Sequence, residues 1–138
     1  MIAYDIPRQV LNIPVRKCMR CPPVTVAPST SIIDLMYTMN QKNIGSVVVE
    51  EKGRALGVIT EKDILVRAVS SEKDLYSTRA REIMSTPIRF IDVDRPIKEA
   101  LELMHHHNLR RLVVIENEAI VGIVTERRLL AEILKLGI

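Results

Sequence analysis

The chain has few aromatic residues: its 138 residues include one Phe, three Tyr and no Trp. Proteins that hold single-stranded nucleic acid commonly stack its bases on aromatic side chains. A formal net charge of +3 adds only weak attraction for a polyanion, although it suits small ligands that carry phosphate. The composition therefore disfavours nucleic-acid binding, which is kept below as an alternative.

The chain has only two cysteines, Cys18 and Cys21, in a single Cys-x-x-Cys. A structural zinc site takes four ligands, and the sequence offers no second cysteine pair. A thioredoxin-like redox motif would open a helix directly after a strand, and that context is missing. We therefore expect Cys18 to be a small buried apolar side chain.

Long apolar runs are also missing, since none approaches the ~18–20 residues of a membrane-spanning helix. The first residues carry neither the basic start nor the apolar stretch of a secretory signal. A content of 47% hydrophobic and 27% charged residues is typical of a folded domain of this length. We expect a cytoplasmic protein with no membrane contact.

The sequence does contain an internal repeat. One constant shift in numbering, which places Met19 on Met84 and Gly57 on Gly122, superimposes the two halves without a gap. Two copies of a unit too short to bury its own apolar face imply one composite core, with clefts between the copies as the natural ligand sites. The same shift pairs Pro22 with Pro87, Ile32 with Ile97, Met39 with Met104, Asn43 with Asn108, and Thr60-Glu61 with Thr125-Glu126.

Each copy is predicted to have the order β-α-β-β-α. In the first copy we expect a strand at 24–26, a helix that begins at Ile32, strands at 47–49 and 56–60 around a polar turn at 50–54, and a helix from 61 to about 69. In the second copy we expect a strand at 89–91, a helix with Pro96 at its first position, strands at 112–115 and 121–125 around a turn at 116–118, and a helix from 126 to about 136.

The first helix of each copy carries one apolar stripe. Ser31 is the expected N-cap of the first, with Asp34 at the third helical position. Apolar residues then recur at i, i+3, i+4 and i+7, which is typical of an amphipathic helix. The stripes are Ile32, Leu35, Met36 and Met39 in the first copy, and Ile97, Ala100, Leu101 and Met104 in the second.

The repeat predicts the domain organisation. The copies occupy residues 15–70 and 80–138, and a polar linker at 71–79 joins them. Residues 1–14, which contain two prolines, form an N-terminal arm outside the repeat. The sequence leaves open whether this arm packs on its own copy or on a partner chain.

The second strand of each copy ends in a shared motif. Gly57-Val58-Ile59-Thr60 is followed by Asp63, and its twin Gly122-Ile123-Val124-Thr125 is followed by Arg128. A strand of the form Gly-apolar-apolar-Thr with an x-x-Asp helix start resembles the C-terminal signature of the CBS domain, named after cystathionine β-synthase. The resemblance covers both copies and leaves out only the arm and the linker.

The resemblance implies a tandem CBS pair, or Bateman module: an α/β fold of two repeats related by pseudo-twofold symmetry, with two clefts between them. Such modules typically bind AMP, ADP, ATP, S-adenosylmethionine or related adenosine compounds. They act as regulatory sensors of an enzyme or transporter rather than as catalysts, and commonly form homodimers. No Ser-His-Asp, Cys-His or paired-carboxylate set is visible in this sequence, so we do not expect an enzyme. The alternative is a dimeric scaffold or nucleic-acid-binding protein without nucleotide sensing.

Asp63 and Thr60 are the expected ribose-binding residues. A carboxylate just after a strand end can accept hydrogen bonds from both vicinal ribose hydroxyls. The spacing Thr60-x-x-Asp63 is also a capping box, which stabilises a helix start without any ligand. The resemblance favours the ribose role, and both roles can coexist.

The second copy departs from this pattern, because Arg128 takes the place of Asp63 and a guanidinium accepts no hydrogen bond. We therefore expect one competent nucleoside cleft and a second cleft that is empty, weak or differently used. Arg127 and Arg128 are candidates to bind phosphate oxygens. The resemblance implies the same role for Arg110 and Arg111, of which only one should point inward because a strand alternates its faces.

Ile59, Ile88 and Leu109 are candidates to enclose the adenine, although core packing is the commoner role for such residues. His105, His106 and His107 do not suggest a metal site, because three consecutive helical residues point about 100° apart and do not converge on one ion. No metal or other cofactor is expected.

Overall fold

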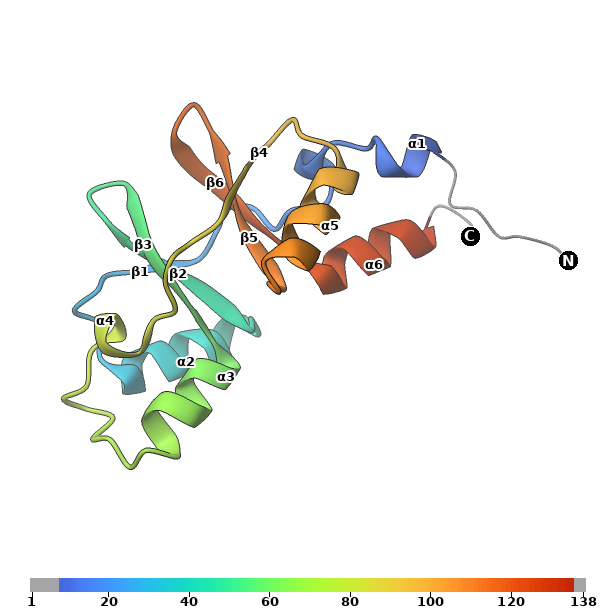
Figure 1. Cartoon of the computed structure of the whole chain (residues 1–138). Helices are drawn as coiled ribbons and strands as arrows, with labels where there is room; N and C mark the ends of the chain where they lie inside the picture. The colour runs from blue at the N-terminus through green and yellow to red at the C-terminus, as the bar shows by residue number, and fades with distance from the viewer. Residues whose placement is uncertain (1–7, 136–138) are drawn as a thin grey trace, which may run out of the picture. The chain divides into compact units, whose positions relative to one another are not determined.

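The structure is a computed structural model, and it describes residues 8–135. The chain forms two compact units (Figure 1). One unit is Pro23–Ile88, and the other joins the segment that ends at Pro22 to the segment that begins at Arg89. Each unit is described by itself.

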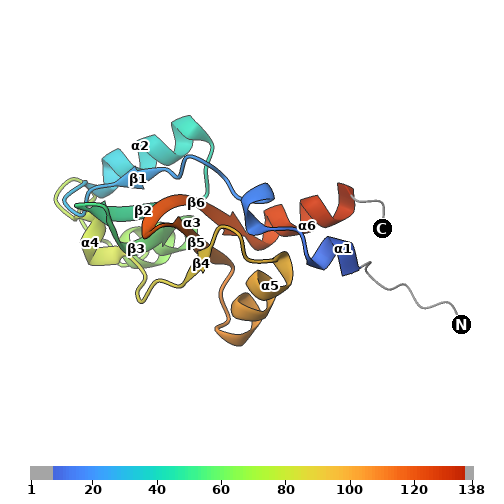
Figure 2. The same cartoon turned by 90° about the horizontal axis from the view of Figure 1, so that it is seen from above.

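The unit Pro23–Ile88 is built on a three-stranded sheet in the order β1-β2-β3. The strand β1 (Thr25–Val26) pairs in parallel with β2 (Ser46–Glu51), which pairs in antiparallel with β3 (Arg54–Thr60). Parallel neighbours need a crossover, and α2 (Ile32–Lys42) provides it between β1 and β2 (Figure 2). After β3 come α3 (Glu61–Ile64), the π-helical turn η2 (Leu65–Val69) and, beyond a loop, α4 (Ala80–Ile83).

The start of α2 confirms the prediction made from the sequence. Ser31 is the N-cap, and its hydroxyl accepts a hydrogen bond from the Asp34 amide at 3.2 Å. The predicted stripe faces the core, and Met36 packs against its edge. The buried core of this unit consists of Ile32, Leu35, Met39, Ile44, Val47, Val49, Ile59, Ile64, Ala68, Ala80 and Ile83.

The second unit repeats this arrangement. Its sheet has the order β4-β5-β6, with β4 (Phe90–Asp92) parallel to β5 (Arg111–Glu116) and β5 antiparallel to β6 (Ala119–Thr125). The helix α5 (Ile97–His106) crosses from β4 to β5, and α6 (Glu126–Lys135) follows β6. The expected order of elements is therefore confirmed in both copies of the chain.

Two local predictions need correction. The polar turns are shorter than expected, because the paired strands continue to Glu51 and Arg54 in one hairpin and to Glu116 and Ala119 in the other. Two residues remain in each turn, and all have positive φ: Lys52 and Gly53, and Asn117 and Glu118. Two-residue turns of this kind match the twist of the flanking strands.

The second correction concerns Pro96, which is the N-cap of α5 and not its first helical residue. Its ψ of 154° is extended, so the helix begins at Ile97. The extended residue lets Pro96 form an isolated bridge with Pro14, and the Ile97 amide donates to the carbonyl of Ile13 at 2.8 Å. This pairing holds residues 13–14 of the expected arm within the second unit.

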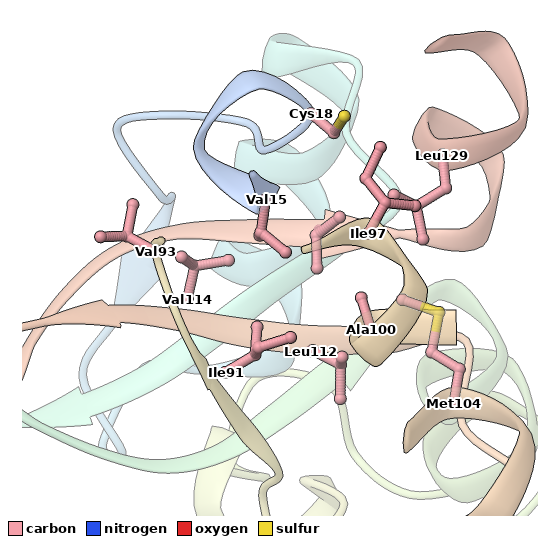
Figure 3. Close-up of a cluster of buried hydrophobic side chains, with 11 residues drawn as sticks. Val15, Cys18, Ile91, Val93, Ile97, Ala100, Met104, Leu112, Val114 and Leu129 are labelled. Carbon is pink, nitrogen blue, oxygen red and sulfur yellow. The ribbon is translucent and has the colours of Figure 1, made fainter. Parts of the chain in front are cut away.

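The segment that leads into each repeat packs with the core of the other repeat. Val15 and Cys18, 0% and 1% exposed, belong to the core that includes Ile97 and Leu129 (Figure 3). Their counterparts Ala80 and Ile83 belong to the core of Pro23–Ile88. The repeats 15–70 and 80–138 describe the duplication of the sequence, and the packing units exchange these leading segments.

The described part of the arm forms α1 (Arg8–Leu11), which contacts α5, and η1 (Val15–Lys17) follows it. Residues 1–7 of the expected arm lie outside the described residues. Within 8–135, no helix has the length and apolar content needed to cross a membrane.

Candidate functional site

The candidate site lies where β3 ends and α3 begins. The Thr60 hydroxyl accepts a hydrogen bond from the Asp63 amide at 3.2 Å, and the Thr60 amide donates to Oδ2 of Asp63 at 2.9 Å. The Thr60 hydroxyl also lies 3.1 Å from the same Oδ2 and donates to it. These contacts confirm the capping box, which satisfies two backbone amides that the helix start leaves unpaired.

The other oxygen of Asp63 is held from outside the helix start. Oδ1 accepts a hydrogen bond from the Ser85 hydroxyl at 3.0 Å and lies 3.7 Å from Nε of Arg67. Arg67 also donates from Nη1 to the carbonyls of Ile83 and Met84, at 3.2 and 3.1 Å. Ser85 and Arg67 therefore join Asp63 to the segment Ile83–Ser85.

The Asp63 carboxylate is well supplied with donors. Its side chain is 11% exposed, and its two oxygens face four donor groups. A carboxylate offers about four acceptor positions, so a further donor binds mainly by replacing one of those present. The exchangeable donors are hydroxyls, the same type of group that a ribose offers.

The corresponding place in the other unit has the opposite charge. Thr125 caps α6 as Thr60 caps α3, and its hydroxyl accepts from the Arg128 amide at 3.2 Å. The Arg128 side chain donates from Nε to the carbonyl of Cys18 at 3.4 Å. Arg128 provides no acceptor for a diol, and the asymmetry between the two sites stays a prediction from the sequence.

The motif glycines lie under the methionines of the leading segments. A Cβ at Gly57 would lie 2.7 Å from the side chain of Met84, and a Cβ at Gly122 would lie 2.7 Å from that of Met19. In each unit an isolated bridge also pairs the leading segment with the second strand, Val58 with Ser85 and Arg20 with Ile123. The spacing that suggested a ligand motif thus has a packing cause as well.

The phosphate-binding candidates all lie in the second unit and differ in exposure. Arg110 and Arg127 are exposed, and neither side chain forms a hydrogen bond or ion pair with residues 8–135. Arg111, the first residue of β5, is partly buried. Arg127 borders a groove of about 510 Å³ between α5 and α6, lined also by Leu101, Met104, His105, Glu126 and Leu130.

The adenine-pocket candidates divide between the units. Ile59 is fully buried in the core of Pro23–Ile88, and Ile88 is partly buried at the end of that unit. Leu109 packs against the core of the other unit. Core packing therefore explains Ile59 and Leu109 without a ligand.

The remaining residues considered in the sequence are Cys18 and the three histidines. Cys18 is buried in the core, as predicted, and burial raises the pKa of its thiol, with a smaller contribution from Glu132. Desolvation and the charge of Arg89 lower the pKa of His107, which lies edge-on to His106 with ring centroids 4.8 Å apart. In residues 8–135, no three His, Cys, Asp or Glu side chains are placed to hold a metal ion.

Sequence reasoning missed Ser85 and Arg67. Arg67 lies one helical turn after Asp63, a spacing that places two side chains on one face of a helix and could have indicated the pair. Ser85 carried no such signal, because it lies far from Asp63 in the chain and comes close only through the exchange of leading segments.

Comparisons with known proteins agree with this architecture. The CBS domain model matches residues 15–70 and 80–135. An uncharacterized protein of Methanopyrus kandleri is 37% identical over 109 residues, which are 78% of this chain and 56% of that protein. A CBS domain-containing protein of Bacillus subtilis is 32% identical over 110 residues, 80% of this chain and 78% of that protein.

A solved structure has the same fold. The CBS domain pair of protein MJ0100, in complex with 5′-methylthioadenosine and S-adenosyl-L-methionine, gives a TM-score of 0.77 at 24% identity. The match covers 86% of this chain and 94% of that one. Two β-α-β-β-α copies with the Gly-apolar-apolar-Thr motif define a tandem pair of CBS domains. The chain belongs to the CBS domain family and carries the domain twice.

Proposed function

We propose that this protein is a regulatory module that binds an adenosine-containing ligand and performs no chemistry on it. CBS pairs generally bind such ligands, and the solved pair of protein MJ0100 holds two of them. AMP, ADP, ATP and S-adenosylmethionine are the candidate ligands. A cytoplasmic location remains a prediction from the sequence.

The observation that supports this proposal is the Asp63 carboxylate at the junction of β3 and α3. Only hydroxyls and one guanidinium, besides the Thr60 amide, contact its oxygens. A ribose diol can replace hydroxyl donors with two charge-assisted hydrogen bonds. We assign ribose binding to Asp63 and Thr60.

The arginines would account for preference among ligands. We propose that Arg110 and Arg127, which are exposed and whose guanidinium groups form no hydrogen bond or ion pair with residues 8–135, bind phosphate oxygens of a charged ligand. Arg111 and Arg128 stay candidates for this role. Ile59, Ile88 and Leu109 stay candidates for the adenine.

Homodimer formation is part of the proposal. Leu130 and Leu134 on α6 are 59% and 61% exposed, and their repeat counterparts Leu65 and Val69 are 58% and 44% exposed. An apolar helix face repeated in both units suits a partner with the same duplication, which a second copy of this chain provides. An enzyme or transporter that responds to the dimer is the further partner expected for a sensor.

Thermal unfolding with AMP, ADP, ATP and S-adenosylmethionine, each at millimolar concentration, tests the proposal. A ligand present at about 100 times its Kd stabilises the folded protein by about 2.7 kcal/mol. For a chain of this size we expect a rise in Tm of roughly 5–10 °C. If none of the four compounds changes the Tm, the proposed function is wrong.

Two matched variants locate the site. Asp63→Asn keeps the size of the side chain and removes its charge, and we expect it to abolish the ligand-dependent rise in Tm. Asp34→Asn makes the same change at the same helical position of α2, where the exposed carboxylate accepts no hydrogen bond from residues 8–135, and it should keep the full rise. An equal loss in both variants would count against a ribose site at Asp63.

A further inference from the structure

Two donors to Asp63 come from outside the capping box, Arg67 and Ser85. Arg67 also donates to backbone carbonyls, whereas the Ser85 hydroxyl donates to no other acceptor among residues 8–135. This hydroxyl lies 3.0 Å from Oδ1 of Asp63. The backbone of Ser85 is held separately, since the Ser85 amide donates to the carbonyl of Val58 at 2.9 Å and the Val58 amide donates back at 3.2 Å. The hydroxyl can therefore leave Asp63 while the backbone of Ser85 stays paired with β3.

The other donors to Asp63 are harder to remove. The Thr60 amide is part of the capping box, and the Thr60 hydroxyl is needed by the Asp63 amide. Arg67 stands farther off, at 3.7 Å, and is anchored to the carbonyls of Ile83 and Met84. A hydroxyl that exchanges for another hydroxyl also costs the carboxylate no acceptor position.

The position of Ser85 in the chain gives this exchange a consequence. Ser85, at the end of the segment Ile83–Ser85, pairs with Val58 of β3. Residues 86–88 follow, and the chain then enters the other unit. A contact that forms or breaks at Ser85 therefore acts on the connection between the two repeats. The other repeat has no equivalent contact, because Arg20 and Arg128 take the places of Ser85 and Asp63.

We propose that Ser85 is the positioning residue of the Asp63 site and reports its occupancy. In the empty site the Ser85 hydroxyl holds Oδ1 of Asp63. A ribose hydroxyl takes its place on Oδ1, and the segment Ile83–Ser85 loses one of its attachments. This inference rests on the proposed function and adds to it the path by which a bound ligand loosens the connection between the repeats.

The test compares Ser85→Ala with wild type by calorimetric titration with AMP. Alanine removes the donor that competes with the ribose, so we expect AMP to bind at least about tenfold more tightly, in line with the value of a hydrogen bond to a charged group. Ser85→Thr keeps a hydroxyl and should bind AMP as wild type does. Ser77→Ala, a change at an exposed serine of the same unit, serves as the matched control and should leave the Kd unchanged.

Hydrogen–deuterium exchange of the peptide that covers residues 83–88 provides the second readout. In wild type we expect AMP to increase exchange in this peptide, and 2′,3′-dideoxyadenosine 5′-monophosphate, which lacks only the diol, to leave it unchanged. In Ser85→Ala the peptide should exchange faster without ligand and show no further increase with AMP. A purely structural role of Ser85 would not produce this dependence on the diol.

The outcomes separate the two proposals. If wild type binds none of the adenosine compounds, the proposed function fails and this inference with it. If wild type binds AMP through Asp63 but Ser85→Ala binds it equally or more weakly, only the role of Ser85 is overturned. The same holds if AMP leaves exchange at 83–88 unchanged or lowers it in wild type.

Discussion

The side chain of Arg128 donates from Nε to the backbone carbonyl of Cys18, 110 residues earlier in the chain. The repeat counterpart of this carbonyl belongs to Ile83, and it accepts a hydrogen bond from Arg67, one helical turn beyond Asp63. In each unit the equivalent carbonyl thus accepts a hydrogen bond from an arginine. The two arginines occupy repeat positions that differ by one helical turn. In the second unit the arginine occupies the position at which the first unit has its carboxylate.

This relationship predicts the effect of removing Arg128. Arg128→Ala should lower the free energy of unfolding by about 0.5–1 kcal/mol, because the lost hydrogen bond is long and the side chain is exposed. The control Arg127→Ala removes a neighbouring guanidinium that bonds to nothing in residues 8–135, and it should have almost no effect. Urea unfolding measures both.

Titration of the same two variants with ATP and adenosine separates fold from ligand binding. Removing a guanidinium that binds phosphate should weaken the binding of ATP more than the binding of adenosine. If Arg128→Ala weakens both ligands equally, Arg128 acts only through the fold.

The motif glycines predict a similar cost for two equivalent substitutions. A Cβ at Gly57 would lie 2.9 Å from the Cβ of Met84, and a Cβ at Gly122 would lie 2.8 Å from the backbone carbonyl of Arg20, and neither atom moves when a side chain rotates. Overpacking typically costs about 1–3 kcal/mol. Gly57→Ala and Gly122→Ala should therefore both fall at the upper end of this range in urea unfolding.

A double-mutant cycle identifies the cause of this cost. Adding Met84→Ala should recover part of the cost of Gly57→Ala beyond the additive expectation, because Cγ and Sδ of Met84 are removed while its Cβ stays. Adding Met19→Ala should likewise recover only part of the cost of Gly122→Ala, because the carbonyl of Arg20 stays in place. No recovery at either site would contradict the packing explanation.

The two capping threonines predict a shared effect on stability and a separate effect on binding. Thr60→Ala and Thr125→Ala should each lower the free energy of unfolding by about 1 kcal/mol, because each hydroxyl caps the helix that follows. Only Thr60 also donates to a carboxylate, at 3.1 Å from Oδ2 of Asp63. Thr60→Ala alone should weaken AMP in calorimetric titration, and an equal loss in Thr125→Ala would argue against the assigned ribose site.

The buried thiol of Cys18 predicts a dependence of stability on pH. Burial raises the pKa of Cys18, so the thiolate forms more easily in the unfolded chain, where the pKa is about 8.5. The stability that the neutral thiol contributes is complete below that pH and is lost as the pH rises through the higher pKa of the folded protein. Unfolding by urea between pH 7 and 10 should therefore show a steeper decline in wild type than in Cys18→Val, which has no thiol to ionise at this position.

Reaction with a thiol reagent checks the same feature at neutral pH. The exposed Cys21 should react quickly and Cys18 only as the protein unfolds. Rapid labelling of Cys18 in folded Cys21→Ser would show that the thiol is more accessible than its burial indicates.

The groove between α5 and α6 predicts how the dimer can be disrupted. Leu130 lines this groove and is 59% exposed, so Leu130→Glu places a charge on the apolar face and should shift the protein to a monomer. Ala131→Glu adds the same charge at the next, exposed residue of α6, outside the groove lining, and should leave the mass unchanged. Sedimentation velocity over a range of concentrations measures the mass, and a wild-type monomer throughout would contradict the proposed homodimer.

Much of the fold could be predicted because its signals are local. The spacing of Ile32, Leu35 and Met39 indicates a helix face, and Ser31 marks where the helix begins. The hairpin turns were predicted too long because charged residues such as Glu50 and Arg54 are compatible with an exposed strand end as well as with a turn. The capping box at Thr60 and Asp63 was also visible, since both of its residues lie within one helical turn.

The amino-acid sequence by itself determined the duplication, the order of elements in each copy and the capping residues, because these depend on spacings of a few residues. Tertiary structure alone decided which core each leading segment joins. A duplicated chain offers the apolar side chains of Val15 or Ala80 two similar cores, and only packing in three dimensions selects one. That selection brings Ser85 to Asp63 and Cys18 to Arg128, and it therefore also decides what surrounds the candidate site.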